Sequence, residues 1–318
     1  MERNVYEGGT TSGSSLDLGR HLIERVCVGD ISTRSAENFG GRAAFVDGER
    51  AITFVEFNKK ANRVASALLG IGLQRGDVVG VMARNCIELL LTYFGCAKAG
   101  LICSPANLGL RAEEIAYCLR DSRAKVLIVE GALAERAAAL PSMLPDLQRI
   151  YWTGATAPDA PKTAGTFETL LGSGNETEVE VYVPERDPVQ LLYTSGTTAH
   201  PKGVLTSHLA VTFTALSAAL ANHTTHETPL LVVLPLFHCA LLNAGAIPAL
   251  TVGATAVLMP GFDPIKVAEA IEKHRVSSLV LLPMMYGALL REPQVRRYDL
   301  SSVKRAAYAM APMPMERL

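Results

Sequence analysis

Apolar residues along this chain recur with two different spacings, and each spacing predicts a different element. Between Phe54 and Leu68 the apolar side chains stand three or four residues apart, which is typical of a helix with one buried face. Thr53 and Glu56 have the spacing of a capping box, so this helix is expected to begin after Thr53. Residues 78–82, by contrast, form a short apolar run that is typical of a buried strand.

Helix and strand signals alternate along most of the chain. This alternation predicts an α/β fold of layered, parallel-rich sheets flanked by helices. Residues 15–39 are expected to form a helix followed by a short loop, and residues 43–53 a hairpin that turns at Asp47 and Gly48. The stretch 153–183 predicts a surface connection, least structured from 165 to 180. The other expected strands are 101–104, 125–129, 149–152, 189–193, 230–234, 276–282 and 303–308, and the other expected helices are 87–99, 112–119, 133–140, 209–221, 267–274 and one that opens at Pro283.

The length of 318 residues is too great for one small core and predicts two packed lobes. We expect the first αβ lobe at 75–205, with a loop of candidate chemistry at its end, and the second at 16–74 together with 206–318. Hydrophobic residues make up 49% of the chain and charged residues 19%, which is typical of a compact protein and not of a disordered one.

Charge and cysteine usage narrow the class of partner. The net charge is −1 with the signs interleaved, which argues against nucleic acid as a partner. Six scattered cysteines without a C-x-x-C pair indicate free thiols in a reducing cytoplasm, and residues 1–15 lack the apolar segment of a signal peptide. Residues 229–260 carry no formal charge, but prolines and polar residues interrupt them, so buried core is favoured over a membrane span. Peripheral attachment to a membrane stays an open alternative.

The candidate chemistry is concentrated in residues 194–203. The expected strand 189–193 runs into Thr194, which is followed by small or hydroxylated residues, a proline, Lys202 and Gly203. Small residues let backbone N–H groups approach phosphate oxygens, hydroxyl groups add hydrogen bonds, and a lysine supplies a mobile positive charge. The composition therefore predicts a phosphate-binding loop.

Two kinds of phosphate loop can be compared with this stretch. From Gly196 to Lys202 the spacing matches a Walker P-loop, but Pro201 offers no N–H at the second glycine, and Gly203 replaces the Ser or Thr that binds magnesium. A P-loop kinase or ATPase is therefore disfavoured. Residues 193–203 instead resemble Tyr-Thr-Ser-Gly-Thr-Thr-Gly-x-Pro-Lys-Gly, the signature loop of the adenylate-forming enzymes. This superfamily contains acyl-CoA and aryl-CoA ligases, luciferases and the adenylation domains of peptide synthetases.

Other stretches resemble the same superfamily and support the assignment. Residues 52–57, 95–100 and 111–117 are similar to its early core motifs, which we expect to hold the fold together without taking part in chemistry. Ala199 departs from the usual glycine of the loop, which we interpret as tolerable variation. The resemblance implies an N-terminal AMP-binding domain over 1–318 that is incomplete at its C-terminus, and the family's C-terminal lid domain is expected to be absent from the chain as well. We expect the chain alone to fold but not to complete adenylation.

The resemblance also implies roles for individual residues. His238, in a Pro-x-Phe-His segment, matches the family histidine where the acid meets ATP, and it is the expected catalytic residue; a buried core histidine is the alternative. His238, Ala311 and Pro312 are expected to border the acyl pocket, which Met310 would narrow. Thr194 is also expected near Mg²⁺, a hard cation that prefers oxygen ligands. The residues expected around the phosphates of ATP are Thr194, Ser195, Gly196, Thr197, Thr198, Lys202 and Gly203.

The activity that the resemblance implies is that of an ATP-dependent acid–CoA ligase, with ATP, Mg²⁺ and coenzyme A. A carboxylate attacks the α-phosphorus of ATP, pyrophosphate leaves, and coenzyme A captures the acyl-adenylate. We expect a medium- or long-chain fatty acid, because residues 229–260 are apolar and the expected pocket segments hold no carboxylate for an ammonium group. Two alternatives stay open. One is a non-catalytic ATP- or acyl-binding protein descended from a ligase, and the other is adenylation of an aryl or other non-fatty acid.

Overall fold

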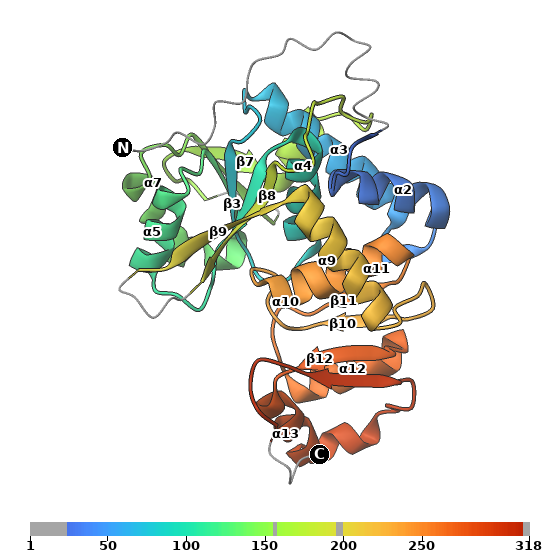
Figure 1. The fold of residues 1–318 in the computed structure, drawn as a ribbon. Helices are drawn as coiled ribbons and strands as arrows, with labels where there is room; N and C mark the ends of the chain where they lie inside the picture. Colours follow the sequence, from blue (N-terminus) through green and yellow to red (C-terminus); the bar gives the residue numbers. More distant parts are fainter. Residues whose placement is uncertain (1–23, 155–157, 195–199, 314–318) are drawn as a thin grey trace.

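The computed structural model describes residues 24–154, 158–194 and 200–313, whose strands form two sheets (Figure 1). Sheet A has the order β13-β12-β10-β11-β1-β2, and sheet B the order β7-β6-β5-β3-β4-β8-β9. Only β1–β2 and β8–β9 pair antiparallel among the described strands. Sheet A contains β1 (Ala43–Asp47), β2 (Arg50–Thr53), β10 (Leu230–Val232), β11 (Ala256–Leu258), β12 (Ser278–Leu281) and β13 (Arg305–Tyr308). Sheet B contains β3 (Val78–Met82), β4 (Ile102–Pro105), β5 (Val126–Glu130), β6 (Arg149–Thr153), β7 (Thr163–Thr166), β8 (Pro188–Thr194) and β9 (Lys202–Ser207).

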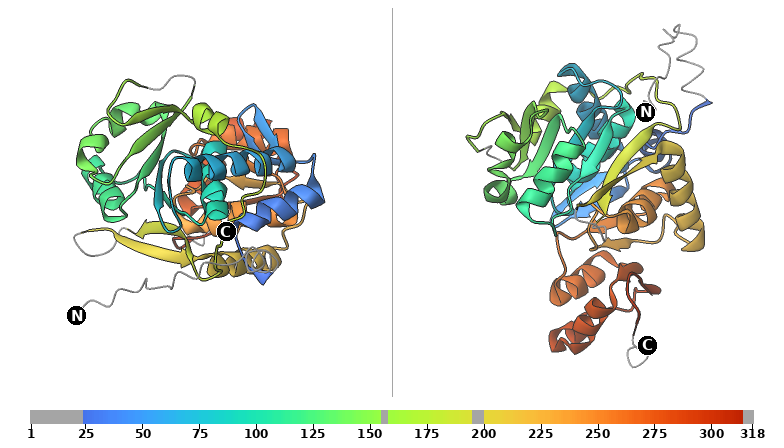
Figure 2. Two further views of the ribbon diagram at one scale, coloured as in Figure 1. Left: turned by 90° about the horizontal axis from the view of Figure 1, so that it is seen from above. Right: turned by 60° about the vertical axis from the view of Figure 1, so that its left-hand side comes forward.

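Helices fill the space between the sheets and cover their outer faces (Figures 1 and 2). The core between the sheets receives side chains from α2 (Gly29–Phe39), α3 (Phe54–Gly70), α4 (Ile87–Ala99), α8 (Phe167–Ser173), α9 (His208–Ala221) and α11 (Ile247–Val252). The outer face of sheet B packs against α5 (Ala112–Asp121), α6 (Ala134–Ala137) and α7 (Leu140–Met143). The outer face of sheet A packs against α12 (Pro264–His274) and α13 (Pro283–Arg291). The shorter segments are η1 (Gly131–Leu133), α10 (Cys239–Leu241), the π-helical η2 (Leu242–Ala246) and η3 (Pro293–Arg297).

One hydrophobic core joins the two sheets. Helix α4 is buried at nearly every position, as expected of a helix that is apolar all round. The Phe45 ring of β1 lies 4.8 Å from the Phe57 ring of α3, which lies 5.4 Å from the Phe94 ring of α4. Val79 and Val81 of β3 contribute to the same core from sheet B. The predicted α/β fold of layered, parallel-rich sheets is confirmed, while the division into lobes at 75–205 and 16–74 with 206–318 stays a prediction.

Elements with strong local signals form as predicted. Strand β3 and helix α4 have the predicted bounds, and the hairpin β1–β2 turns where expected. The Thr53 hydroxyl accepts from the Glu56 N–H at 3.2 Å, and the Glu56 carboxylate accepts from the Thr53 N–H at 2.9 Å, so the capping box is present.

Three expectations were wrong. The stretch 153–183 is not a plain surface connection, because it contains β7 and α8, and α8 buries Phe167, Leu170 and Leu171. The helix expected at 133–140 is broken into η1, α6 and α7, the last of which has Pro141 in its first turn. In the stretch 15–39, expected to be a helix followed by a short loop, helix α2 occupies residues 29–39, where the loop was expected, and residues 25–28 before it are not helical; residues 15–23 lie outside the described residues.

Close packing of α3 on α4 depends on Gly95. A Cβ atom at this position would lie 2.7 Å from the Val64 Cβ and 3.2 Å from the Ala61 carbonyl oxygen. We expect Gly95→Ala to lower the free energy of unfolding by about 1–2 kcal/mol, because the two helices would have to separate. Gly70→Ala is the matched control, since a Cβ there would meet no atom within 4 Å and alanine favours the helix. Urea denaturation measures both, and equal stability of the two variants would contradict the packing argument.

Candidate active site

The predicted phosphate loop connects two strands of one hairpin at an edge of sheet B. Strand β8 ends at Thr194, and β9 begins at Lys202, which pairs with Thr194 across the hairpin. The Thr194 hydroxyl donates to the Lys202 carbonyl oxygen at 3.4 Å. Both residues are exposed. Ser195, Gly196, Thr197 and Thr198 lie outside the described residues, so the structure places only the two arms of the loop.

Packing within the hairpin leaves little room for a side chain at Gly203. It pairs with Tyr193, and a Cβ atom there would lie 2.9 Å from Leu191 Cδ1 and 3.2 Å from the Tyr193 ring. Strand β9 itself was missed by the sequence analysis, which expected no strand between the loop and the following helix. Packing in the hairpin therefore favours a glycine at residue 203 whether or not the loop binds phosphate.

Helix α5 supports both arms of the loop. The Tyr193 hydroxyl donates to Asp121 Oδ2 at 2.7 Å, and the Tyr117 ring stacks on the His200 ring at 4.7 Å between centroids. Burial and the hydrogen bond to Asp121 raise the pKa of Tyr193, so its hydroxyl stays a donor at neutral pH. Asp121 was not identified from the sequence, although the expected motif at 111–117 lies one turn before it.

Lys202 supplies the positive charge of the hairpin. The side chain is exposed at the first position of β9. In the part of the chain that the structure describes, no carboxylate lies within ion-pair distance of Lys202. The ammonium group is therefore available to an anionic ligand held by the loop.

His238 lies at the other sheet, where the chain leaves β10. It is the N-cap residue of α10, and its side chain is exposed, which rules out the alternative of a buried core histidine. The His238 Nδ1 lies 3.7 Å from the Cys239 sulfur, which is also exposed. Helix α10 continues into η2, a π-helical segment of the kind that occurs frequently at functional sites.

Ala311 and Pro312 lie at the same edge of sheet A as His238. They follow β13, which is separated from β10 by β12, and all three strands run parallel. The carboxyl ends of β10 and β13 therefore lie about 10 Å apart at one edge. Ala311 and Pro312 are exposed, and Met310 has a φ of 68°, the left-handed region that favours glycine. This backbone explains why the resemblance places a glycine there.

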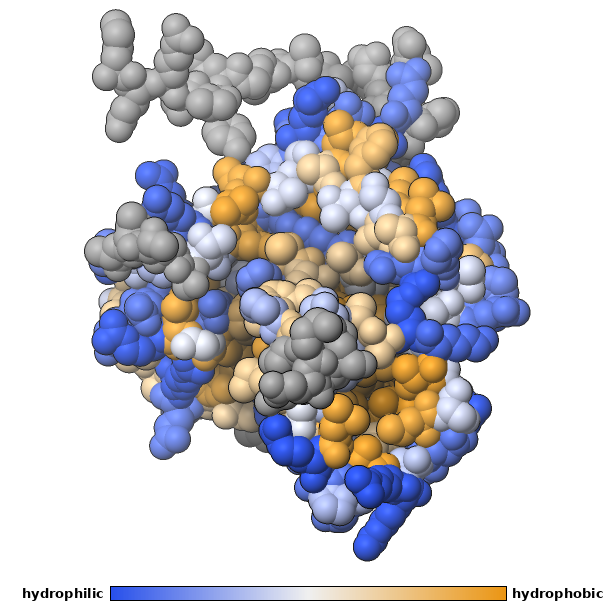
Figure 3. Space-filling model, turned by 60° about the horizontal axis from the view of Figure 1, so that its bottom comes forward, coloured by the Kyte–Doolittle hydropathy of each residue, from blue (hydrophilic) through white to orange (hydrophobic). Residues whose placement is uncertain are grey.

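Apolar side chains surround this edge. Met284 follows β12 and is 69% exposed, Met310 follows β13 and is 55% exposed, and Phe237 follows β10 and is half-buried. Figure 3, which brings the lower end of Figure 1 forward, shows apolar residues gathered on this end of the molecule. The segments 235–239, 282–286 and 309–313 contain no Asp, Glu, Lys or Arg. The carboxyl edge of sheet A thus offers apolar contacts and a histidine.

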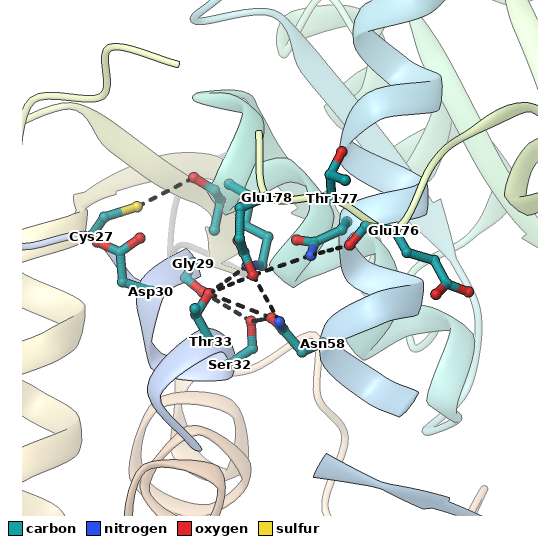
Figure 4. A network of polar contacts seen from close by, with 12 residues as sticks. Cys27, Gly29, Asp30, Ser32, Thr33, Asn58, Glu176, Thr177 and Glu178 are labelled. Carbon is teal, nitrogen blue, oxygen red and sulfur yellow. Dashed lines mark hydrogen bonds and ion pairs between the residues drawn. The ribbon is translucent and has the colours of Figure 1, made fainter. Parts of the chain in front are cut away.

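A polar network fixes the connection that leads into β8 (Figure 4). The Lys98 ammonium on α4 is 2% exposed and lies 2.6 Å from Glu178 Oε2 and 2.7 Å from the Thr33 hydroxyl. Asn58 donates to Glu178 Oε1 at 2.8 Å, and Asn62 donates to the Glu176 carbonyl oxygen at 2.9 Å. Burial lowers the pKa of Lys98 despite the neighbouring carboxylate. Burial opposes the charge of Glu178 as well, but Lys98 and the amide hydrogen bonds outweigh it and lower the pKa of Glu178.

Comparison with known proteins identifies the class of protein to which this fold and site belong. The family model described as AMP-binding enzyme matches residues 32–318, and the chain belongs to that family. It is 31% identical over 289 residues to a feruloyl-CoA synthase of Amycolatopsis sp, a match that covers 91% of this chain and 55% of the relative.

Solved structures give the same result. The anthranilate CoA ligase AuaEII, in complex with anthranoyl-AMP, is similar with a TM-score of 0.84 and 26% identity over 92% of this chain and 57% of that one. A fatty acyl CoA synthetase of Mycobacterium tuberculosis is similar with a TM-score of 0.78 and 27% identity over 92% of this chain and 56% of that one. The predicted resemblance to adenylate-forming enzymes is confirmed, and the chain spans about half the length of the curated relatives it matches. Within the described residues, no helix has the length and apolar character needed to cross a membrane.

Proposed function

We propose that this chain is the nucleotide- and acid-binding part of an ATP-dependent acid–CoA ligase. In this reaction a carboxylate oxygen attacks the α-phosphorus of ATP, and the bond to pyrophosphate breaks. The thiolate of coenzyme A then attacks the acyl carbonyl carbon, and AMP leaves. The observation that carries the proposal is the β8–β9 hairpin, in which Thr194 and Lys202 pair at the two arms of a hydroxyl-rich loop in a chain of the AMP-binding enzyme family.

The residues of the hairpin suit a triphosphate. The exposed Lys202 ammonium would neutralise charge on the β- and γ-phosphates, and Ser195, Gly196, Thr197, Thr198 and Gly203 are proposed to surround them. Bound Mg²⁺ would supply further neutralisation of phosphate charge. The Thr194 hydroxyl is the protein oxygen that we propose near the ion, because a hard cation prefers oxygen ligands.

The carboxyl edge of sheet A is the proposed acid site. His238 would hydrogen-bond the carboxylate or the developing acyl phosphate, and Ala311 and Pro312 would border the acyl group. The apolar side chains at this edge favour an uncharged acyl group over an amino acid, because no carboxylate from these segments could pair with an ammonium. The six cysteines are free thiols, in keeping with the proposed cytoplasmic location.

Two classes of acid fit this edge. A medium- or long-chain fatty acid remains our proposal, supported by the exposed methionines, whose flexible side chains adapt to an alkyl chain. An aryl acid is the second candidate. It is favoured by the similarity to a feruloyl-CoA synthase and to an anthranilate CoA ligase.

The decisive experiment measures acid-dependent exchange of pyrophosphate into ATP, and CoA thioester formation, on the protein as its gene encodes it. The panel contains octanoate, palmitate, ferulate, anthranilate and phenylalanine. We expect AMP and a thioester with one of the first four acids and none with phenylalanine. Release of ADP in place of AMP would contradict the proposal and point to a kinase or ATPase. ATP binding without exchange for any acid would support the non-catalytic alternative.

A further inference from the structure

A buried asparagine joins the two sheets next to His238. Asn85 lies in the loop between β3 and α4 and is 4% exposed. Its Nδ2 donates to the carbonyl oxygens of Val232 at 3.3 Å and Leu234 at 3.0 Å, and its Oδ1 accepts from the Leu236 N–H at 2.8 Å. One side chain of the sheet B half thus makes three hydrogen bonds to the chain that leaves β10 in sheet A.

Two of these bonds satisfy backbone groups that the sheet cannot reach, while the third shares the Val232 carbonyl oxygen with the Met259 N–H, which donates to it at 2.9 Å. Strand β10 ends at Val232, so Leu234 and Leu236 lie beyond the last residue of its ladder, and both are buried. A buried peptide group without a partner costs about 1–3 kcal/mol. The amide of asparagine offers a donor and an acceptor together, which is what a carbonyl oxygen and an N–H two residues apart require.

Asn85 is itself held from sheet B. The N–H of the preceding residue, Arg84, donates to Glu130 Oε2 at 2.9 Å, and the Arg84 guanidinium pairs with the same carboxylate at the end of β5. The residue after it, Cys86, is the N-cap of α4, the helix buried between the sheets. Contacts within the sheet B half therefore hold the Asn85 side-chain amide in place, and its hydrogen bonds position the segment after β10.

His238 depends on that alignment. It stands two residues after Leu236, and its N–H donates to the Pro235 carbonyl oxygen at 3.2 Å, which closes a tight turn that contains Leu236. The ring is exposed, so the backbone of this turn, more than packing around the imidazole, decides the position from which the His238 side chain extends.

We propose that Asn85 is a positioning residue that sets the backbone of residues 234–238 and, through it, the place of the His238 imidazole at the acid site. The role toward the acid rests on the proposed function, whereas the alignment of His238 does not. Without the three hydrogen bonds, the backbone of residues 234–238 shifts, and the His238 imidazole moves away from the position where it would contact the carboxylate of the acid. The β8–β9 hairpin, which these three bonds do not involve, keeps its structure.

The test of alignment uses the 318-residue chain with Asn85→Ala and the milder Asn85→Ser, whose hydroxyl replaces one of the three bonds. The matched control is Asn62→Ala, because Asn62 is also buried, at 1% exposure, but donates to Glu176 and Glu178. Imidazole NMR signals of His238, assigned with His238→Gln, and amide exchange at Leu236 are measured. Both Asn85 variants are expected to shift the His238 signal and to speed amide exchange at Leu236, and Asn85→Ala should do so more than Asn85→Ser. The His274 signal should not change in these variants. Asn62→Ala should change neither the His238 signal nor the exchange at Leu236. An unchanged His238 signal in folded Asn85→Ser and Asn85→Ala would overturn the alignment.

The second arm tests the consequence for the acid. Dissociation constants of MgATP, octanoate and ferulate are compared for the same variants. A misplacement of about 1 Å can cost a reaction about 100-fold, and we expect a smaller effect on binding: acid binding should weaken about 10-fold in Asn85→Ala, and MgATP binding by less than about 2-fold. Equal loss for acid and MgATP would mean that Asn85 only stabilises the fold, and would overturn the positioning role. If the wild-type chain bound neither acid, the proposed acid site would fail, while the NMR arm would still decide whether Asn85 aligns His238.

Discussion

Replacing Glu178 by glutamine is expected to lower the free energy of unfolding by about 2–3 kcal/mol, because it leaves the Lys98 ammonium buried without its counter-charge. Breaking a buried ion pair typically costs about 3–5 kcal/mol. Lys98 is 2% exposed, but Glu178 is 45% exposed, so water compensates part of the loss. The expected loss is therefore about 2–3 kcal/mol, below the range for a fully buried pair. Urea denaturation at an unchanged m-value measures the difference.

Two further variants separate the ion pair from the general effect of a changed surface. Glu176 pairs with Lys59 and Arg63 at the surface, where water screens the charges, so Glu176→Gln should cost far less stability than Glu178→Gln. The double variant Lys98→Met with Glu178→Gln removes both charges and should recover most of the stability lost in Glu178→Gln. If Glu176→Gln and Glu178→Gln lost equal stability, the charge of the buried Lys98 ammonium would not be the reason for the loss in Glu178→Gln.

The pH dependence of stability follows from the same pair. The pKa of Glu178 is lowered on folding, so its contribution is present above the unfolded pKa, about 4.3, and is lost as the pH falls through the lower folded pKa. The pKa of Lys98 is also lowered, so the unfolded chain holds that proton more tightly and stability rises toward alkaline pH. In Glu178→Gln the acid-limb contribution of Glu178 should be absent.

Replacing Lys202 by alanine is expected to weaken MgATP binding by about 10- to 100-fold, since a hydrogen bond to a charged group contributes about 1.5–3 kcal/mol. This expectation rests on the proposed function and on the exposed position of Lys202 opposite Thr194. Lys202→Arg should lose less, because the charge is kept although the shape of the donor changes. Calorimetric titration in magnesium measures both variants.

The control for this experiment is Lys266→Ala, which removes an exposed lysine from α12 on the outer face of sheet A. It leaves the net charge equal to that of Lys202→Ala, so any long-range effect of charge is matched. If Lys202→Ala bound MgATP as tightly as Lys266→Ala does, the role assigned to Lys202 would have to be abandoned.

Elements with local signals could be predicted from the sequence, and elements defined by distant partners could not. The capping box at Thr53 and the apolar runs of β3 and α4 carry their own boundaries. Strand β9 has no such signal, because its residues are exposed and its place depends on pairing with β8. Helix α8 also lacks a strong local signal, because its three buried side chains stand among Gly, Ser and Thr residues that favour turns.

The candidate site divides in the same way. The loop motif identified Thr194 and Lys202, and the hairpin places them opposite each other. Asn85 and Glu178 were missed, because each is a single polar residue whose partners lie more than 75 residues away in sequence. Burial of a polar side chain is a tertiary property, and a sequence without alignment gives no sign of it.

The order of strands in sheet A has a consequence for how the protein folds during synthesis. The Thr255 hydroxyl donates to the carbonyl oxygen of Ala43, 212 residues earlier, and β1 pairs with β11 at the same place. At typical elongation rates, roughly 10–40 s pass between the synthesis of these two segments. Strands β3 to β9 leave the ribosome in that interval and can pair with one another, whereas the hairpin β1–β2 must wait for its partner. Closing this long loop is therefore a late and slow step, and until then one edge of the hairpin is open to pairing with another chain.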